Sequence, residues 1–87
     1  MKLEEVGIVI GKKLTVRRIG ISRIPIVVSF EGTEIRKGGL LVSSYGEGTS
    51  VIEAKKDYCK KISGQVLVIN AYTDGRKEIR LPKGITI

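Results

Sequence analysis

The stretch that decides the fold is YGEGTSVIEAKKDYCKKI, residues 45–62. It predicts the end of a strand, a glycine turn and then a capped helix. Ser50 and Glu53 have the spacing of a capping box, in which each side chain accepts a hydrogen bond from the other residue's backbone N–H. With the helical period, one narrow stripe is apolar and the opposite side is charged. The apolar stripe contains Val51, Ala54, Tyr58 and Ile62. Such a helix must lay this stripe on a neighbouring element.

Strand patterns lie on both sides of the helix and supply that neighbour. Before it, residues 13–21, 25–31 and 40–45 are expected to form strands, the second continuing through Thr33 and Ile35 with a kink at Gly32. Lys37-Gly38-Gly39 predicts a turn between the second and third strands. After the helix, Asp74-Gly75 predicts a tight hairpin joining 66–72 to 77–81. The unbroken VLVI run at 66–69 favours a strand that is covered on both faces or central in its sheet.

Two segments are irregular. The first strand loses its alternation at Arg17-Arg18, where one extra residue in a bulge would restore it and aim both guanidinium groups outward. Residues 2–10 fit a short helix through Leu3, Val6 and Ile10, and the Ile8-Val9-Ile10 run also fits a strand. We favour the helix. The chain is then a single α+β domain, 1–87, in two layers, with one main helix packed on antiparallel sheet and the order (α)βββαββ.

Composition points to a soluble intracellular protein. One cysteine among 87 residues allows no internal disulfide, which fits a reducing cytosol. No apolar run approaches the ~18 residues of a membrane span. Glu4 and Glu5 interrupt the region where a signal peptide is basic and then apolar. We therefore expect a cytoplasmic location and no membrane partner.

The net charge of +7 is concentrated near the N-terminus. Residues 10–23 carry five cations and no acid: Lys12, Lys13, Arg17, Arg18 and Arg23. A basic block of this kind favours the phosphate backbone of a nucleic acid, and these five residues are the predicted contacts. We expect them to form one positive face, which Arg36, Arg76 or Arg80 would extend. The alternative is a solvated surface that keeps a small domain soluble, and charge alone does not separate the two.

The sequence shows no catalytic or metal-binding constellation. Gly46-Glu47-Gly48 before a helix resembles a phosphate cradle, but no lysine follows the second glycine and Glu47 would repel a phosphate, so a turn with a cap is favoured. Without histidine, Cys59 has no imidazole base and is expected to be a half-buried structural thiol. We predict no cofactor, no metal and no enzymatic activity. Among the aromatic residues, only Tyr45 and Tyr72 remain as stacking candidates, and each fits a core position equally well. The sequence therefore favours backbone contacts by Lys and Arg over the stacking of single-stranded bases.

The order β-β-β-α-β and the stretch YGEGTSVIEAKKDY resemble the small domain of HicB-type antitoxins over residues 25–72. Members of that family carry a glycine turn, a Thr or Ser cap and a Glu-Ala pair that opens the helix. The matching positions here are Gly46, Gly48, Thr49 or Ser50, Glu53 and Ala54. The resemblance implies a partial RNase H-like fold, similar to double-stranded-RNA-binding folds. The chain is also similar to small uncharacterised phage and mobile-element proteins, which implies an accessory role.

Two departures from the HicB pattern limit what it implies for function. The family usually adds a DNA-binding segment after this domain, for which we expect no room here, and a charge of +7 suits a basic toxin poorly. Two functions therefore stay open. One is a non-catalytic, nucleic-acid-associated accessory module, and the other is a protein–protein interaction module, antitoxin-like or regulatory, that forms a homodimer through a sheet edge.

Overall fold

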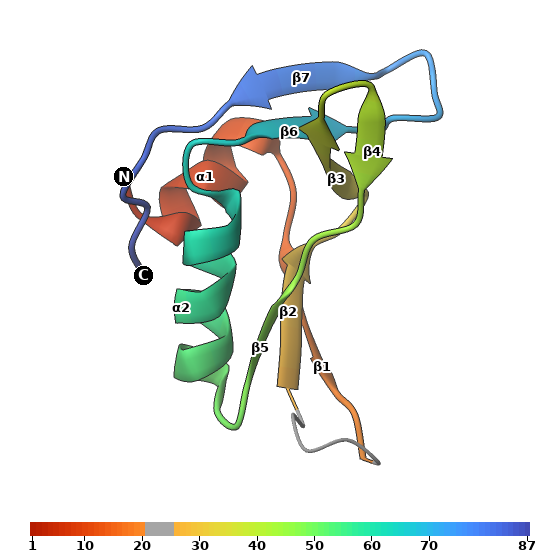
Figure 1. Ribbon diagram of the computed structural model, residues 1–87. Coiled ribbons are helices and arrows are strands. Elements are labelled where there is room, and N and C mark those ends of the chain that lie inside the picture. Colours follow the sequence, from red (N-terminus) through yellow and green to blue (C-terminus); the bar gives the residue numbers. More distant parts are fainter. Residues whose placement is uncertain (21–25) are drawn as a thin grey trace.

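A computed structural model describes residues 1–20 and 26–87. These residues form two helices and seven strands, and the strands make two antiparallel sheets (Figure 1). The α+β class is therefore confirmed. The helices are α1 (Leu3–Ile10) and α2 (Val51–Ile62). The strands are β1 (Leu14–Arg18), β2 (Ile26–Phe30), β3 (Thr33–Lys37), β4 (Leu40–Val42), β5 (Gly46–Gly48), β6 (Val66–Ile69) and β7 (Lys77–Arg80). Ile21, Arg23 and Pro25, which the sequence placed in or beside strands, lie outside the described residues.

The strands divide into a three-stranded sheet, β1-β2-β5, and a four-stranded sheet, β4-β3-β6-β7. The chain passes between the two sheets at Gly32 and again at 43–45. Gly32 has φ +68, so the predicted kink is present, but the chain there changes sheet and does not continue one strand. The predicted strand 40–45 is likewise split, because β4 ends at Val42 and the chain forms β5 in the other sheet. The Gly38-Gly39 turn is confirmed by the Lys37–Leu40 pair that flanks it.

The pairing of β1 with β2 is regular from Leu14 opposite Phe30 to Arg18 opposite Ile26. The predicted bulge at Arg17-Arg18 is therefore wrong. Its premise was that an apolar residue is required at Arg18, on the face that carries Ile26. That face is not buried at this end of β1, where Val16 is already 44% exposed and Arg18 is exposed. An arginine there needs no extra residue to reach solvent.

Two glycines let α2 lie directly on β5, as the ribbon shows (Figure 1). A Cβ atom at Gly46 would lie 2.5 Å from the Cβ of Tyr58 and closer still to the Ala54 carbonyl oxygen. One at Gly48 would lie 2.6 Å from the Ala54 nitrogen. Real Cβ contacts are not this short, so any side chain at either position would push the helix away. The segment predicted as a glycine turn is thus a strand on which a helix rests.

The predicted register of α2 is confirmed. Ala54, Tyr58 and Ile62 are fully buried, Val51 is half-buried, and Lys56 and Lys60 are exposed. The stripe packs on the three-stranded sheet, against β5 and β2.

Of the two hydrogen bonds predicted for the capping box of α2, one is present and the other has a different donor. Ser50 Oγ accepts from the Glu53 N–H at 3.2 Å as expected. The Glu53 carboxylate, however, accepts from the hydroxyl and the N–H of Thr49 and not from Ser50. These bonds, the hydroxyl first, hold the pKa of Glu53 below its usual value.

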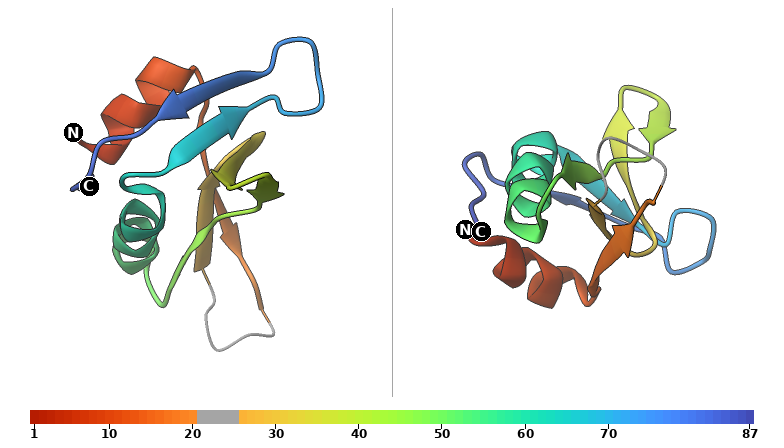
Figure 2. Two further views of the ribbon diagram at one scale, coloured as in Figure 1. Left: turned by 45° about the horizontal axis from the view of Figure 1, so that its top comes forward. Right: turned by 90° about the horizontal axis from the view of Figure 1, so that it is seen from below.

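The N-terminal segment is helical, as favoured, and α1 buries Leu3, Val6 and Ile10 in the core. A Cβ at Gly7 would lie 3.0 Å from the Phe30 ring, so glycine here sets how close α1 comes to β2. The two termini lie side by side in both views of Figure 2, joined by a bridge between Lys2 and Thr86. One hydrophobic core therefore contacts both helices and both sheets.

The β6–β7 pair is confirmed, from Val66 opposite Arg80 to Ile69 opposite Lys77. β6 is central in its sheet, and Leu67, Val68 and Ile69 are buried, as the VLVI run predicted. The predicted turn at Asp74-Gly75 is present, because the Arg76 N–H donates to the Thr73 carbonyl at 3.2 Å across it, but it lies within a longer loop, 70–76, and does not join the strands directly. Asn70 leaves the strand with φ +52, and its carbonyl accepts from both the N–H and the hydroxyl of Thr73, so pairing stops before Asp74.

Candidate nucleic-acid interface

The fold does not bring the predicted basic block onto one face. Because β1 is regular, Arg17 and Arg18 point to opposite sides of the three-stranded sheet. The Lys12 side chain is directed toward the loop after β6, because its Nζ donates to Asn70 Oδ1 at 2.8 Å. This bond links the start of β1 to that loop. Lys13 is exposed, and Arg23 lies outside the described residues. The expectation of one continuous positive face is therefore corrected: the four described cations are divided among separate surfaces.

Arg17 lies on the face of the three-stranded sheet that points away from α2. Thr15, Val27 and Ser29 share this face, since Ile26, Val28 and Phe30 alternate with them and are buried. A hollow of about 520 Å³ opens there, and most of its other polar lining is hydroxyl groups. The polar lining consists of Thr15, Arg17, Ser29, Glu31, Thr33, Ser43, Ser44 and Tyr45. Arg17 has no carboxylate within 4 Å in the described part of the chain.

A second hollow, about 350 Å³, is also lined by the segment 43–45 that passes between the sheets. Lys37 and Lys61 line it together with Ser43, Ser44 and Tyr45, and its lining contains no acid. Tyr45 borders both hollows and is 43% exposed. We name these residues together the Tyr45 surface: Arg17, Lys37, Ser43, Ser44, Tyr45 and Lys61.

α2 holds Tyr45 in place through Lys61. The Lys61 Nζ donates to the Tyr45 carbonyl at 2.9 Å and lies 5.3 Å from the centre of the Tyr45 ring. The same ammonium pairs with Asp57 at 3.1 Å, and the Glu47 N–H donates to that carboxylate at 2.8 Å. Partial burial would raise the pKa of Asp57, but the Glu47 N–H and Lys61 outweigh it and leave that pKa below its usual value. Asp57 thus stays charged and fixes the crossing segment to the helix.

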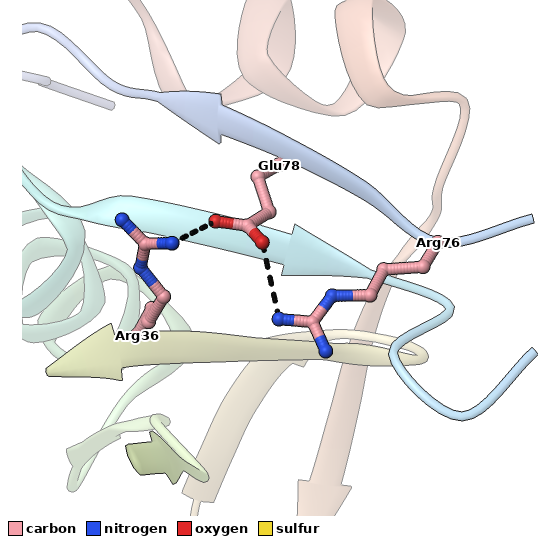
Figure 3. A network of polar contacts seen from close by, with 3 residues as sticks. All are labelled: Arg36, Arg76 and Glu78. Atoms are coloured by element: carbon pink, nitrogen blue, oxygen red, sulfur yellow. Dashed lines mark hydrogen bonds and ion pairs between the residues drawn. The ribbon is translucent and has the colours of Figure 1, made fainter. Parts of the chain in front are cut away.

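The predicted extension of the positive face through Arg36 and Arg76 is not observed. Glu78 accepts from Arg36 at 2.7 Å and from Arg76 at 3.1 Å on the outer face of the four-stranded sheet (Figure 3). Arg80 is exposed on β7, where its guanidinium reaches the Gly64 carbonyl at 3.4 Å. This second group of cations is on a different sheet from Arg17, and two of its three arginines are already paired.

The alternative sites considered from the sequence are occupied by the protein's own groups. The Glu47 and Thr49 N–H groups, which would form a phosphate cradle, donate to Asp57 and Glu53. Cys59 is buried, and burial raises the pKa of its thiol, as suits a structural residue. Over residues 1–20 and 26–87, no group of three or more metal-ligating side chains is placed to hold an ion. No helix in the same ranges has the length and apolar content to cross a membrane.

Sequence reasoning missed Lys37, Lys61 and the two serines of the Tyr45 surface. The sequence placed Lys37 in the turn with Gly38 and Gly39, whereas it is the last residue of β3, and Lys61 is exposed, as expected for the charged side of the helix. What brings them together is the passage of the chain between sheets at 43–45. The one sequence signal was Tyr45, an aromatic residue at the end of a strand, and it is exposed, as is Tyr72 at 85%.

No protein-family model matches the chain, and neither the curated proteins nor the solved structures contain a significant match. The resemblance to HicB-type antitoxins stays a prediction.

Proposed function

We propose that the chain is a non-catalytic module that binds single-stranded nucleic acid at the Tyr45 surface. The observation that carries this proposal is the exposed Tyr45 ring between two hollows lined by Arg17, Lys37 and Lys61. Proteins that bind single strands combine cations that follow the backbone with aromatic rings on which bases stack. Serine and threonine hydroxyls of the kind found around Tyr45 also hydrogen-bond phosphate oxygens.

Single strands suit this surface better than duplexes. A base that stacks on Tyr45 must be unpaired, and Arg17 and Lys37 line the two hollows that Tyr45 borders. Lys61 contributes less than the other two cations, since a phosphate would compete with Asp57 for it. Glu31 and Glu47 near Arg17 oppose a polyanion and limit the affinity. We therefore expect a dissociation constant in the micromolar range at moderate salt, in line with non-specific binding.

Fluorescence anisotropy with labelled single strands of about 12 nucleotides, and with the matching duplex, tests the proposal at two salt concentrations. We expect the single strand to bind more tightly than the duplex and both affinities to fall as salt is raised. Tyr45→Ala should weaken single-strand binding by roughly tenfold, because stacking on an aromatic ring contributes about 1–3 kcal/mol per base.

Tyr72→Ala is the matched control, because Tyr72 is also exposed but lies in the 70–76 loop, outside the Tyr45 surface. It should bind like the wild type. The absence of binding at low salt, or equal losses for the two tyrosine variants, would reject the Tyr45 surface as a nucleic-acid site.

A further inference from the structure

The outer side of α1 is apolar in the middle and oppositely charged at its two ends. Ile8 is 74% exposed and Val9 is 60% exposed, while Glu4 precedes them and Lys13 follows. Met1 and Ile87 extend the apolar area at the joined termini, at 47% and 44% exposed. The right view of Figure 2 shows α1 at the periphery, with α2 and β1 on its inner side.

This exposure is unusual within the molecule. Among the described residues, the other apolar side chains that are more than 55% exposed are Leu40, Tyr72 and Ile52, and Ile52 is a single exposed residue near the start of α2. Leu40 flanks the Gly38-Gly39 turn and Tyr72 lies in a loop, so each is isolated at the end of a hairpin. On α1, by contrast, adjacent apolar residues lie on a helix whose other side is buried. Contiguous exposed apolar area of this kind indicates a contact surface.

A groove of about 500 Å³ runs beside this helix. Gly7, Leu14 and Phe30 contribute to its apolar lining, and Glu4, Ile8 and Lys13 all border it. Two further cations line it: Lys12, whose Nζ donates to Asn70 Oδ1, and Lys55 on α2. The missing side chain at Gly7 keeps the groove open toward the Phe30 ring. The groove therefore has room for an apolar side chain of a partner, and the two ends of α1 offer opposite charges to that partner.

We propose that this surface binds a second copy of the chain, with the two α1 helices antiparallel about a twofold axis between Ile8 and Val9. Such a self-complementary contact places Glu4 of each copy beside Lys13 of the other, and Ile8 of each beside Val9 of the other. Neither Glu4 nor Lys13 has an ion-pair partner within the described part of its own chain. The surface is separate from the Tyr45 surface, so the dimer does not depend on nucleic-acid binding.

Charge complementarity is the argument for a second copy over an unrelated protein. Along α1 and just after it, the order is acid, apolar pair, base. In an antiparallel second copy the order is reversed, so each acid faces a base and the apolar pairs face each other. Few unrelated surfaces would present this complementary order. One short helix buries a small area, at the low end for specific contacts, so we expect a dissociation constant on the order of 10 µM.

Sedimentation velocity from about 1 to 100 µM tests the proposal, and the wild type should shift from monomer to dimer over this range. Glu4→Lys and Lys13→Glu, each alone, should weaken the dimer by about tenfold, because each places like charges together twice. An equal mixture of these two variants should restore it, since both charge contacts are then opposite again. The double variant Glu4→Lys, Lys13→Glu should also form the wild-type dimer.

Ile8→Asp tests the apolar centre, and Leu40→Asp is its control, being 71% exposed on a hairpin. Ile8→Asp should weaken the dimer at least about tenfold and Leu40→Asp should leave it unchanged. Circular dichroism establishes that each variant is folded. A wild type that stays monomeric at the highest concentration overturns the proposal. So does a dimer that tolerates every α1 variant, which would place the contact elsewhere, for example at the open edge of β1.

Discussion

The solvent-facing sides of the two sheets differ in how they hold their arginines. On the four-stranded sheet, Glu78 accepts from both Arg36 and Arg76. On the three-stranded sheet, Arg17 has no carboxylate within 4 Å among the described residues. From the sequence, Arg17 belonged to the predicted basic block, and Arg36 and Arg76 were expected only to extend it. Ion pairing across neighbouring strands, which the sequence does not display, decides which cations remain available to a polyanion.

The two sheets also differ in how a helix supports them. α2 rests on the backbone of β5 through Gly46 and Gly48, so the three-stranded sheet and the Tyr45 surface depend on one close contact. The four-stranded sheet depends instead on interlocking side chains, among them Ile35, Leu67 and Ile69.

The largest effect is expected for Gly46→Ala. The new methyl group would overlap the Ala54 carbonyl and the Tyr58 Cβ, both of which belong to the rigid helix, so unfolding free energy should fall by about 3 kcal/mol. Gly39→Ala is the control, because no atom lies within 4 Å of a Cβ there and its φ is not positive. Urea unfolding monitored by circular dichroism measures both. Similar stability of the two variants would contradict the close contact of α2 with β5.

Tyr58→Phe should come next. The buried Tyr58 hydroxyl accepts from the Phe30 N–H at 3.1 Å, so its removal leaves a buried donor without a partner. We expect a loss of about 1–2 kcal/mol in the same unfolding experiment. Tyr72→Phe, at an exposed site, should change stability by less than about 0.5 kcal/mol. A Tyr58→Phe variant as stable as the wild type would show that this bond does not link α2 to β2.

Glu78→Gln sharpens the contrast between the arginines. It removes the shared acceptor charge of Arg36 and Arg76 and leaves the three-stranded sheet unchanged. If the ion pairs with Glu78 keep these arginines from binding phosphates, the variant should bind single-stranded nucleic acid about threefold more tightly than the wild type. Its affinity should also depend more steeply on salt. Glu5→Gln is a charge-matched control away from both sheets. Equal gains for the two variants would show that net charge alone determines affinity.

The smallest effect concerns pH. The folded-state pKa of Asp57 lies below its usual value, so its contacts stabilise the fold above the unfolded-state pKa and are lost as the pH falls below about 4. Since this carboxylate is partly exposed, the loss should be about 0.5 kcal/mol or less. Unfolding of the wild type and Asp57→Asn at about pH 7 and about pH 3 measures it. The two curves should differ at the higher pH and converge at the lower one.

Features that depend on the spacing of apolar residues within one helix or strand were predictable from the sequence. The register of α2, the central position of β6 and the helical N-terminus all follow from the spacing of apolar residues. A helix or strand period is a property of neighbouring residues, so these predictions did not need the tertiary structure.

Features that depend on distant contacts were not predictable. Gly46 and Gly48 indicate a turn when taken locally, and their reason emerges only once α2 is packed on them. The bulge at Arg17-Arg18 was inferred from burial that β1 does not have at that end. The Tyr45 surface was missed because Arg17, Lys37 and Lys61 come from three separate elements. In each case a contact between elements, and not the local pattern, decides the outcome.

The most direct test of the central claim compares Arg17→Gln with Arg36→Gln in single-strand binding. Each variant removes one positive charge from the outer face of one sheet. We expect Arg17→Gln to weaken binding by about threefold to tenfold and to flatten the slope of log K against log salt by about 0.7. Arg36→Gln should bind within about twofold of the wild type, because Glu78 already neutralises much of its charge. Equal losses for the two variants, or a larger loss for Arg36→Gln, would contradict the claim.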